Sequence, residues 1–320
     1  MRAVRAVLLT VIFGLLAGFG AAGAARAAGP AEVQMGAYVL RISNVSQKDG
    51  TFDVDMWVWF RWKDAALRPF ESFEVANGRI NSRSNAEISD DGGYFYTSVR
   101  VDATVFHEYD VRRFPLDNHV LSIEFEDENL DAAGLTYAAD AGIGLDPGLK
   151  VDGWAATLLP AQVALHHYPT NYGLRSSGTG GSDYSRLILQ VSLERTSMGA
   201  LFKGFWISAL SVMLGLLAFR VKPTDLDARF GLGVGSIFAA SANAFVITDS
   251  LPQTTFVTLA EQINYIAIGT IFLSVFMSIA SLRLCYAGRE AASEKLDVWG
   301  LALIALGYLA ANVLILIVPL

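Results

Sequence analysis

Few residues of this sequence have the types and spacing that covalent chemistry requires. The chain contains one cysteine, Cys285, and four histidines, of which only His166 and His167 adjoin each other. These counts exclude a disulfide framework and a cysteine-rich zinc site, and they disfavour a histidine-rich metal centre. We find no nucleophile paired with a base and no metal-ligand spacing. We therefore expect no enzymatic activity and no cofactor.

The remaining reactive groups are acids and imidazoles that could bind cations or protons. Calcium prefers carboxylate oxygens, and an acidic segment offers three candidate ligands, Glu126, Glu128 and Asp131. A solvated acidic edge is the commoner origin of such a cluster. His107 and His119 could titrate near neutral pH, although His119 could instead be a hydrogen-bonded core histidine.

Composition limits the classes of protein to which the chain can belong. Hydrophobic residues make up 53% of its 320 residues and charged residues only 17%, whereas ordinary soluble domains are about 25% charged. This composition excludes a soluble enzyme with a single core, and it excludes a disordered chain. The formal net charge of −7 argues against a nucleic-acid partner, which would require a basic face.

The longest apolar runs lie at the N-terminus and in the last third of the chain. Residues 1–27 have the order of a cleaved secretory signal, with basic, apolar and small residues in turn; a retained anchor is the alternative. After Met198 each apolar run approaches the roughly 20 residues that a helix needs to cross a bilayer. We predict a transmembrane domain over residues 199–320, with four helices near 201–219, 229–249, 258–283 and 298–319.

The basic residues between these runs predict the orientation of the chain in the membrane. The links Arg220–Arg229 and Arg283–Lys295 each carry three Lys or Arg residues, and the link Ser250–Val257 carries none. Because basic links stay on the cytoplasmic side, the N-terminal domain and the C-terminus should both lie outside. The expected location is the plasma (inner) membrane, with an extracellular or periplasmic ectodomain.

Residues 28–198 form the predicted ectodomain, and their pattern is that of β-strands. Apolar side chains recur at every second position from Phe52 to Trp62, from Leu121 to Phe125 and from Leu187 to Leu193. A period of two predicts strands with one buried face, and turn signals rich in Asp and Gly separate them. Many short strands of this kind predict an antiparallel β-sandwich of immunoglobulin-like size.

Several features in order along the chain resemble pentameric ligand-gated ion channels, the Cys-loop receptor superfamily. The segment Tyr109–Asp127 carries an aromatic-Pro-x-Asp tip, Phe114–Asp117, and lacks the flanking cysteines, as in prokaryotic members. Ala228–Pro252 is similar to the pore helix of the family, and Asp53–Asp64 to the second strand of bacterial members. The resemblance implies a homopentamer in a lipid bilayer, which opens to permeating ions when an agonist binds.

The resemblance also assigns the lining of the pore to one face of the second predicted helix. Each position would form a ring of five, and acidic rings at Asp227 and Asp249 favour cations. By resemblance Arg229, close to Asp227, turns away from the pore. Phe238 and Phe245 would gate the pore by excluding water, although they could instead pack against neighbouring helices. The implied lining consists of Asp227, Gly231, Gly235, Phe238, Ala242, Phe245 and Asp249.

Glycines take the place of the polar rings that usually line the cytoplasmic half of such a pore. They are consistent with a flexible or wide lower pore, and equally with close packing of the pore helix on the first membrane helix. The alternative function is therefore a membrane receptor or sensor of the same fold that conducts nothing.

By the same resemblance, three loops meet where the ectodomain touches the membrane domain. Arg195, at the end of the last predicted strand, should pair with Asp117, and Asp49 should be a second acid partner. The alternative is that these are unrelated surface charges. Pro115 and Pro252 would stiffen the loops that transmit the motion. The predicted interface comprises Asp49, Phe114, Pro115, Asp117, Arg195, Leu251 and Pro252.

The family binds agonists between subunits, in a box of aromatic side chains. Trp57 and Trp59 point away from the predicted core face, as expected for a cation-binding surface or for subunit packing. Tyr172 and Tyr184 bracket a glycine-rich hairpin that could close over a ligand. The agonist could be a small molecule, a proton or a divalent cation. The candidate ligand-binding residues are Trp57, Trp59, Tyr94, Tyr96, Trp154, Tyr172 and Tyr184.

Overall fold

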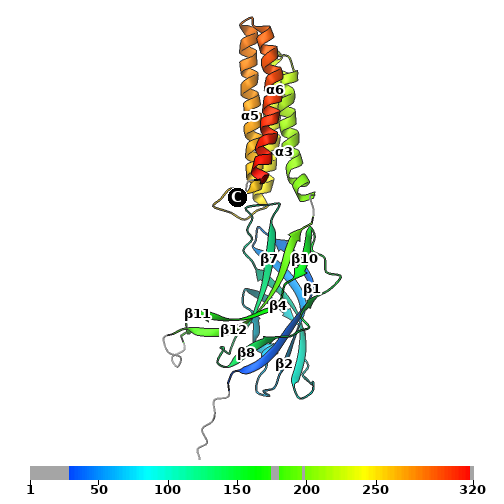
Figure 1. Ribbon diagram of the computed structural model, residues 1–320, viewed down its shortest axis with the longest axis vertical. Helices are drawn as coiled ribbons and strands as arrows, with labels where there is room; N and C mark the ends of the chain where they lie inside the picture. Colours follow the sequence, from blue (N-terminus) through cyan, green and yellow to red (C-terminus); the bar gives the residue numbers. More distant parts are fainter. Residues whose placement is uncertain (1–28, 174–179, 197–198, 318–320) are drawn as a thin grey trace, which may run out of the picture.

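The computed structural model describes residues 29–173, 180–196 and 199–317. A domain built from strands comes first, and a bundle of long helices extends from one end of it (Figure 1). The predicted signal peptide, residues 1–27, lies outside the described residues, and so do residues 174–179 of the hairpin between Tyr172 and Tyr184.

The strand domain consists of two sheets that share one hydrophobic core. The first sheet has the order β4 (Gly78–Arg83), β6 (Phe95–Phe106), β2 (Thr51–Trp62), β1 (Ala31–Ser46) and β8 (Leu135–Ala139), with β5 (Ser89–Asp90) beside β6 and β9 (Gly144–Leu145) beside β1. The second has the order β10 (Trp154–Leu158), β12 (Ser182–Arg195), β7 (Asn118–Asp127) and β3 (Phe73–Val75), with β11 (Gln162–Tyr168) beside β12. A single helical turn, α2 (Pro69–Ser72), precedes β3.

The burial of the strands confirms the predicted sandwich. On β2, all the apolar residues at every second position from Phe52 to Trp62 are at most 1% exposed, and the same holds from Leu187 to Leu193 on β12. Burying each such side chain contributes about 1.5–3 kcal/mol. A slip of one residue would turn the whole set toward water, so the core also determines the register of these strands.

At one edge of the first sheet the strands run parallel, whereas an antiparallel sandwich was predicted. β8 and β9 run parallel to β1, with Ala31 opposite Leu135 and Tyr38 opposite Gly144. The chain reaches this edge after β7, which belongs to the other sheet, so no hairpin requires β8 to run antiparallel to β1. The period of two that predicted the strands carries no information about their direction.

Four helices follow the sheets, namely α3 (Gly199–Leu217), which continues into the 3-10 turn η1 (Ala218–Arg220), α4 (Leu226–Asp249), α5 (Leu259–Tyr286) and α6 (Glu290–Ile317). Among the described residues α4, α5 and α6 are long and apolar enough to cross a membrane, whereas the apolar stretch Gly204–Arg220 is shorter. α6 begins at Glu290 rather than near residue 298, because its charged first turns continue the helix beyond the apolar run.

Side chains cap the beginnings of the second and third of these helices. Asp225 accepts a hydrogen bond from the backbone N–H of Ala228 at 3.3 Å at the start of α4. Thr258 and Glu261 form a capping box at the start of α5, with bonds of 3.3 and 2.9 Å. A cap of this kind contributes about 1 kcal/mol. The caps therefore define where α4 begins and where the link between α4 and α5 ends.

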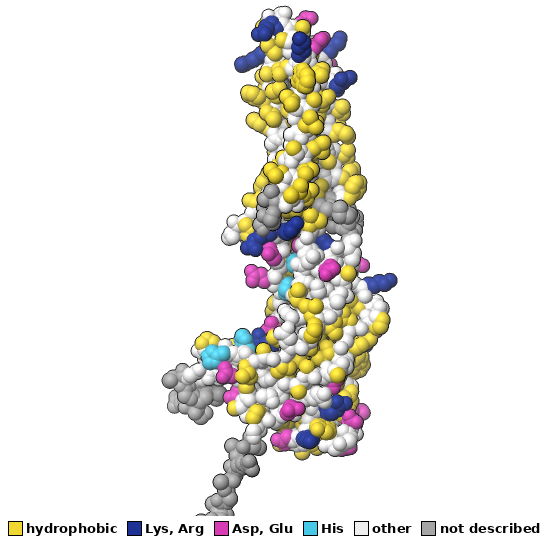
Figure 2. Space-filling view, viewed as in Figure 1, with side chains coloured by type: hydrophobic (Ala, Val, Ile, Leu, Met, Phe, Trp, Pro, Cys, Tyr) yellow, Lys and Arg dark blue, Asp and Glu magenta, His cyan; other side chains and the backbone are white. Residues whose placement is uncertain are grey.

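The surface of the bundle matches a membrane environment. Figure 2 shows mainly hydrophobic side chains along the bundle and a concentration of Lys and Arg at the end remote from the sheets. The link between α5 and α6 lies at that end (Figure 1). An apolar cylinder that is bounded by basic links is the surface that a bilayer-spanning bundle presents.

Candidate functional site

The predicted pore-lining residues lie on the face of α4 that its own chain leaves exposed. The opposite face packs into the bundle and buries Arg229, Gly233, Ser236, Ala240, Asn243 and Ile247. Phe238 and Phe245 are 72% and 73% exposed, so neither is packed into its own bundle. The other predicted lining residues, Asp227, Gly231, Gly235, Ala242 and Asp249, are exposed as well. Spacings of three and four residues thus place the whole set on one uncovered stripe of the helix.

The glycines of α4 divide between its two faces. Gly233 lies on the buried face, where an added Cβ atom would come within 2.6 Å of Val275 on α5. Gly231 and Gly235 lie on the exposed stripe, where an added Cβ atom would meet nothing within 4 Å. Close helix contact explains the first glycine. At the other two positions the exposed stripe carries no side chain.

A polar cluster that the sequence analysis missed holds α4 against its neighbours. Asn243 Nδ2 donates to the Gly204 carbonyl at 3.0 Å, to Ser208 Oγ at 2.9 Å and to Asn264 Oδ1 at 3.2 Å. Ser208 also donates to Asn264, and all three side chains are buried. This asparagine cluster joins α3, α4 and α5. The sequence signal for this cluster was an asparagine inside each of two apolar runs, Asn243 in the second and Asn264 in the third.

An ion pair between Arg195 and Asp117 lies at the end of the ectodomain that faces the helices. Arg195 Nε is 2.8 Å from Asp117 Oδ1, and the Asp117 side chain is 1% exposed. His119 Nε2 is 2.6 Å from the other carboxylate oxygen. Gln47 contacts all three residues, and the Arg195 guanidinium covers the Trp154 ring at 4.2 Å. We call these five residues the base cluster.

The base cluster keeps the Asp117 carboxyl ionised. Burial alone would raise the pKa of this group, but hydrogen bonds from His119 and Arg195, together with the charge of Arg195, lower the pKa to about 2. His119 is therefore the hydrogen-bonded core histidine that the sequence analysis considered. Burial, and to a smaller extent the neighbouring His119, lowers the pKa of His107 from its usual value of 6.5.

Asp49 is not the second acid partner of Arg195, and that prediction was wrong. Its carboxylate accepts a hydrogen bond from Ser46 Oγ at 2.6 Å, and its backbone N–H donates to the same oxygen at 3.1 Å. The turn between β1 and β2, which closes at Gly50 with φ +66°, directs Asp49 back onto its own strand. Gln47 from the same turn reaches Arg195 instead.

Two loops of the ectodomain touch the link between α4 and α5. The Arg112 carbonyl accepts the backbone N–H of Leu259 at 2.8 Å, and the Arg112 guanidinium lies 4.9 Å from the centre of the Phe256 ring. Lys48 Nζ lies 3.0 Å from Asp249 Oδ1 at the outer end of α4. Leu251 is buried and packs into the ectodomain core cluster. The Lys48 loop therefore contacts the end of α4, and the Arg112 loop contacts the link and the start of α5.

The predicted ligand-binding residues are found in three separate places. Trp154 lies in the base cluster, because β10 pairs with the end of β12 and sets Trp154 opposite Arg195. It is remote from the hairpin, so its assignment to a common aromatic box was wrong. Trp57 and Trp59 belong to β2 of the first sheet, Tyr96 belongs to its neighbour β6, and Tyr94 immediately precedes β6. Tyr172 and Tyr184 belong to the hairpin of the second sheet.

The aromatic residues of the first sheet form an open surface rather than a pocket. Trp57 and Tyr94 are each 38% exposed. Trp59 lies against Gly36, where an added Cβ atom would collide with the indole ring. Lys63 Nζ lies 4.6 Å from the centre of the Tyr94 ring. This surface and the hairpin belong to different sheets of the ectodomain.

Tyr172 and Tyr184 line a pocket of about 380 Å³ beneath the hairpin. Tyr168 joins them, with its ring centre 5.9 Å from Tyr172 and 5.6 Å from Tyr184. The rest of the lining is acidic or polar and consists of Glu74, Glu126, Asp127, Glu128 and Asn129. A pocket of three aromatic rings and several carboxylates suits a ligand with a positive charge.

The electrostatics of this pocket reflect its excess of acids. Burial, followed by repulsion from Glu128, Glu126 and Asp127, raises the pKa of Glu74 above 4.5. Glu126 is engaged by Arg186 Nε at 2.7 Å and by the Tyr168 hydroxyl at 2.9 Å. Burial and this bond to Glu126 raise the pKa of Tyr168 to about 12.

The three calcium candidates are not brought together. Glu126 is bound to Arg186 and Tyr168, whereas the Asp131 carboxylate accepts backbone N–H groups of Ala133 and Gly134 at 3.1 and 3.2 Å. In the parts of the chain that the structure describes, no group of three His, Cys, Asp or Glu side chains is arranged to hold a metal ion. The prediction of calcium ligands at Glu126, Glu128 and Asp131 is therefore not supported.

Comparison with known proteins shows receptor subunits as relatives, while no family model matches the chain. The gamma-aminobutyric acid receptor subunit rho-1 of Homo sapiens is 24% identical over 209 residues, which cover 65% of this chain and 42% of that protein. The theta subunit of Mus musculus is 21% identical over 277 residues, covering 77% and 41%, and the pi subunit of Bos taurus is 21% identical over 248 residues, covering 70% and 54%.

This chain therefore spans only 41–54% of the length of these three relatives. The relatives are named as receptor subunits rather than enzymes, in agreement with the expectation from the sequence. Together with the strand domain, the helical bundle and the motif at Phe114–Asp117, these matches confirm the resemblance on which the expectations of fold rested. The chain is similar to subunits of the Cys-loop pentameric ligand-gated channel family.

Proposed function

We propose that this protein is a homopentameric ligand-gated ion channel, in which ligand binding to the ectodomain opens a pore lined by α4. The position of α4 carries this proposal. Its outer end contacts the ectodomain through Asp249 and the adjoining link, while Phe238, Phe245 and the other predicted lining residues form an uncovered stripe along it. Five copies around a closed axis would cover such a stripe and surround a passage.

We further propose that the ectodomain lies outside the cell membrane and the basic end of the bundle lies in the cytoplasm. In this proposal α3, the first of the four helices, also crosses the membrane. The other three, α4, α5 and α6, are long and apolar enough to do so. The concentration of Lys and Arg at the far end of the bundle supports this orientation (Figure 2).

The ligand that this geometry favours is a small organic cation. It would bind in the pocket that Tyr168, Tyr172 and Tyr184 line in one subunit, which we call the tyrosine pocket. The surface around Trp57 and Trp59 of the next subunit, which we call the tryptophan surface, would cover it. Carboxylates at Glu74 and Glu128 supply negative charge, and the rings of Tyr168, Tyr172 and Tyr184 supply cation–π contacts. Gamma-aminobutyric acid, which the relatives' names contain, carries an ammonium group and is a suitable first probe.

The pore is proposed to select cations. Asp227 and Asp249 are exposed at the two ends of α4, and Arg229, the positive charge nearest to Asp227 in the sequence, is 2% exposed and faces the bundle interior. Asp249 contacts Lys48, and both side chains stay largely exposed. Asp227 therefore provides the stronger of the two acidic rings.

The test is current across a planar bilayer that holds the purified protein, under a potassium chloride gradient. Gamma-aminobutyric acid, pH and calcium are stepped in turn on the ectodomain side. Gated current that reverses near the potassium potential supports a cation channel, and reversal near the chloride potential overturns the selectivity proposal alone. Intact pentamers that bind the probe without current in any condition would support the alternative function, a non-conducting receptor of the same fold.

A further inference from the structure

A buried ion pair joins the first turn of α4 to the second turn of α6, at the basic end of the bundle. Arg229 Nη2 pairs with Asp297 Oδ2, and the two side chains are only 1% and 8% exposed. Arg229 Nε and Nη2 also donate to the Val221 carbonyl at 3.0 and 2.8 Å. The pair therefore connects the helix with the predicted lining to the outermost helix and to the link before α4.

Several features make Arg229 dependent on this single carboxylate. A guanidinium without a counter-charge is costly to bury, and Arg229 lies near the N-terminus of α4, where the helix dipole is itself positive. Arg229 Nη1 and Asp297 Oδ1 have no partner among the described residues. One carboxylate contact and one backbone carbonyl thus hold the charge in place. Without them, a long Arg side chain would extend to the nearest water.

Asp227, two residues before Arg229, is exposed at this end of the bundle, which is where a released Arg229 side chain would reach water. Asp227 is the residue proposed to attract cations at the inner mouth of the pore. We infer that Asp297 is a positioning residue for ion selectivity, because its carboxylate keeps the Arg229 charge inside the bundle and away from this mouth. The inference rests on the proposed channel function.

The test compares reversal potentials of full-length variants under the same potassium chloride gradient. Asp297→Asn keeps the shape of the side chain and removes its charge. We expect the ratio of potassium to chloride permeability to fall by roughly an order of magnitude, because the freed arginine offsets the Asp227 ring. Asp297→Glu keeps the carboxylate and should retain the wild-type ratio.

The double variant Arg229→Gln/Asp297→Asn separates the position of the arginine from the charge of Asp297 itself. With no arginine to release, it should conduct with the wild-type permeability ratio, and its neutral amide pair leaves no unpaired charge that would prevent assembly. A double variant that shifts selectivity as far as Asp297→Asn would overturn the inference. So would an assembled Asp297→Asn pentamer with an unchanged reversal potential.

The wild-type protein distinguishes failure of the inference from failure of the proposed function. Wild-type current that reverses near the potassium potential establishes the channel whatever the variants do. A wild-type protein without current in any condition would count against the channel itself, and the selectivity role of Asp297 would be rejected with it.

Discussion

Asp117 shows how one buried carboxylate organises the end of the ectodomain that faces the helices. It accepts bonds from Arg195, His119 and Gln47, which come from three different parts of the chain. Each bond is made to the ionised form, so the cluster depends on the charge of Asp117. The resemblance to a channel family predicted its pairing with Arg195, while His119 and Gln47 were recognised only in the folded structure.

This dependence predicts how stability changes with pH. The pKa of Asp117 in the folded protein is about 2, below its ordinary value of 3.8. A lowered pKa adds stability above the ordinary value, and this contribution is lost as pH falls toward the folded value. The melting temperatures of wild type and Asp117→Asn in detergent should therefore differ most above about pH 4 and converge toward about pH 2.

Asp110→Asn is the matched control for this measurement. The Asp110 side chain is 62% exposed and contacts Arg112 of its own loop, so its loss should change the melting temperature little at any pH. Melting curves of wild type and Asp117→Asn that stay equally far apart over the whole range would contradict the assigned role of Asp117.

A second prediction concerns the proposed apolar gate at Phe238. Replacing this residue by alanine removes the largest side chain from the middle of the exposed stripe of α4, so water should fill a shut pore more easily. Phe238→Ala should therefore conduct without agonist, which single-channel recording can measure. Phe272→Ala is the control, because Phe272 is 66% exposed on α5. Equal leak in both variants would remove Phe238 from the gate.

The helix α4 has one exposed and one buried face, and their separation was predictable from spacing. The predicted lining residues recur every three or four positions, so they share the exposed side of the helix, and the small residues Gly233, Ser236 and Ala240 share the buried side. What the spacing did not reveal is which partner each buried residue contacts. The asparagine cluster became visible only when α3 and α5 were placed beside α4.

The asparagine cluster predicts a stability effect that is confined to the buried face. Asn243→Ala removes three hydrogen bonds that connect α4 to α3 and α5, and such bonds inside membrane bundles average about 0.6 kcal/mol each. We expect the variant to lose about 1–2 kcal/mol of stability and to melt earlier in detergent. Ser241→Ala, on the exposed side of the same helix, should melt like wild type, and similar melting of both variants would contradict the role of the cluster.

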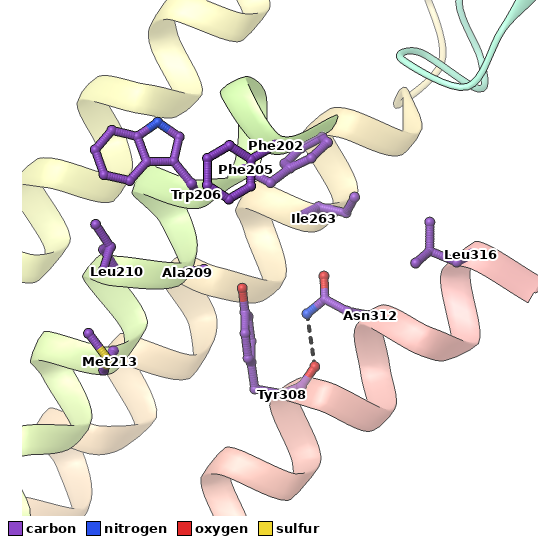
Figure 3. Close-up of a pocket in the computed structure, with 10 residues that line it drawn as sticks. All are labelled: Phe202, Phe205, Trp206, Ala209, Leu210, Met213, Ile263, Tyr308, Asn312 and Leu316. Carbon is purple, nitrogen blue, oxygen red and sulfur yellow. Dashed lines mark hydrogen bonds between the residues drawn. The ribbon is translucent and has the colours of Figure 1, made fainter. Parts of the chain in front are cut away.

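An apolar groove lies between α3, α5 and α6 of the same bundle. Figure 3 shows Trp206 and Met213 on α3 and Tyr308 and Asn312 on α6, which line this groove. Its volume is about 700 Å³. Asn312 donates to the Tyr308 carbonyl at 2.8 Å within its own helix. The groove adds no contact to α4, so we assign it no part in the proposed mechanism.

The proposed ligand site is complete only in the proposed pentamer. The tyrosine pocket and the tryptophan surface lie on different sheets of one subunit, and neither alone encloses a ligand on all sides. Closed symmetry brings unlike faces of neighbouring copies together. A site of this kind consists of Tyr172 from one subunit and Trp57 from the next.

Mixed pentamers test this arrangement directly. Trp57→Ala and Tyr172→Ala should each weaken the response to agonist, because every interface of either homopentamer lacks one half of the site. Co-expression of the two variants should restore a part of the response, because some interfaces then combine intact halves. The control is Trp57→Ala co-expressed with the double variant Trp57→Ala/Tyr172→Ala, in which no interface is intact. Equal responses in the two mixtures would place the ligand within one subunit.

Local sequence patterns were sufficient to predict the strands and helices but not which of them would pack together. The period of two in β2 and β12 and the long apolar runs predicted strands and helices, because burial of one face acts on each segment separately. The resemblance of short motifs to a channel family also predicted the pairing of Arg195 with Asp117. Partners that lie far apart in the sequence depended on which strands and helices became neighbours.

Three contacts were visible only in the tertiary structure. Gln47 rather than Asp49 lies beside Arg195, and Trp154 packs against the same arginine in the base cluster. Asp297 pairs with Arg229. The tertiary structure also showed that Glu126 is bound to Arg186 and that β8 runs parallel to β1. Each of these contacts joins segments separated by many residues. Charges and hydrogen bonds select the partner that folding brings within about 3 Å, and only the packed sheets and helices determine which partner that is.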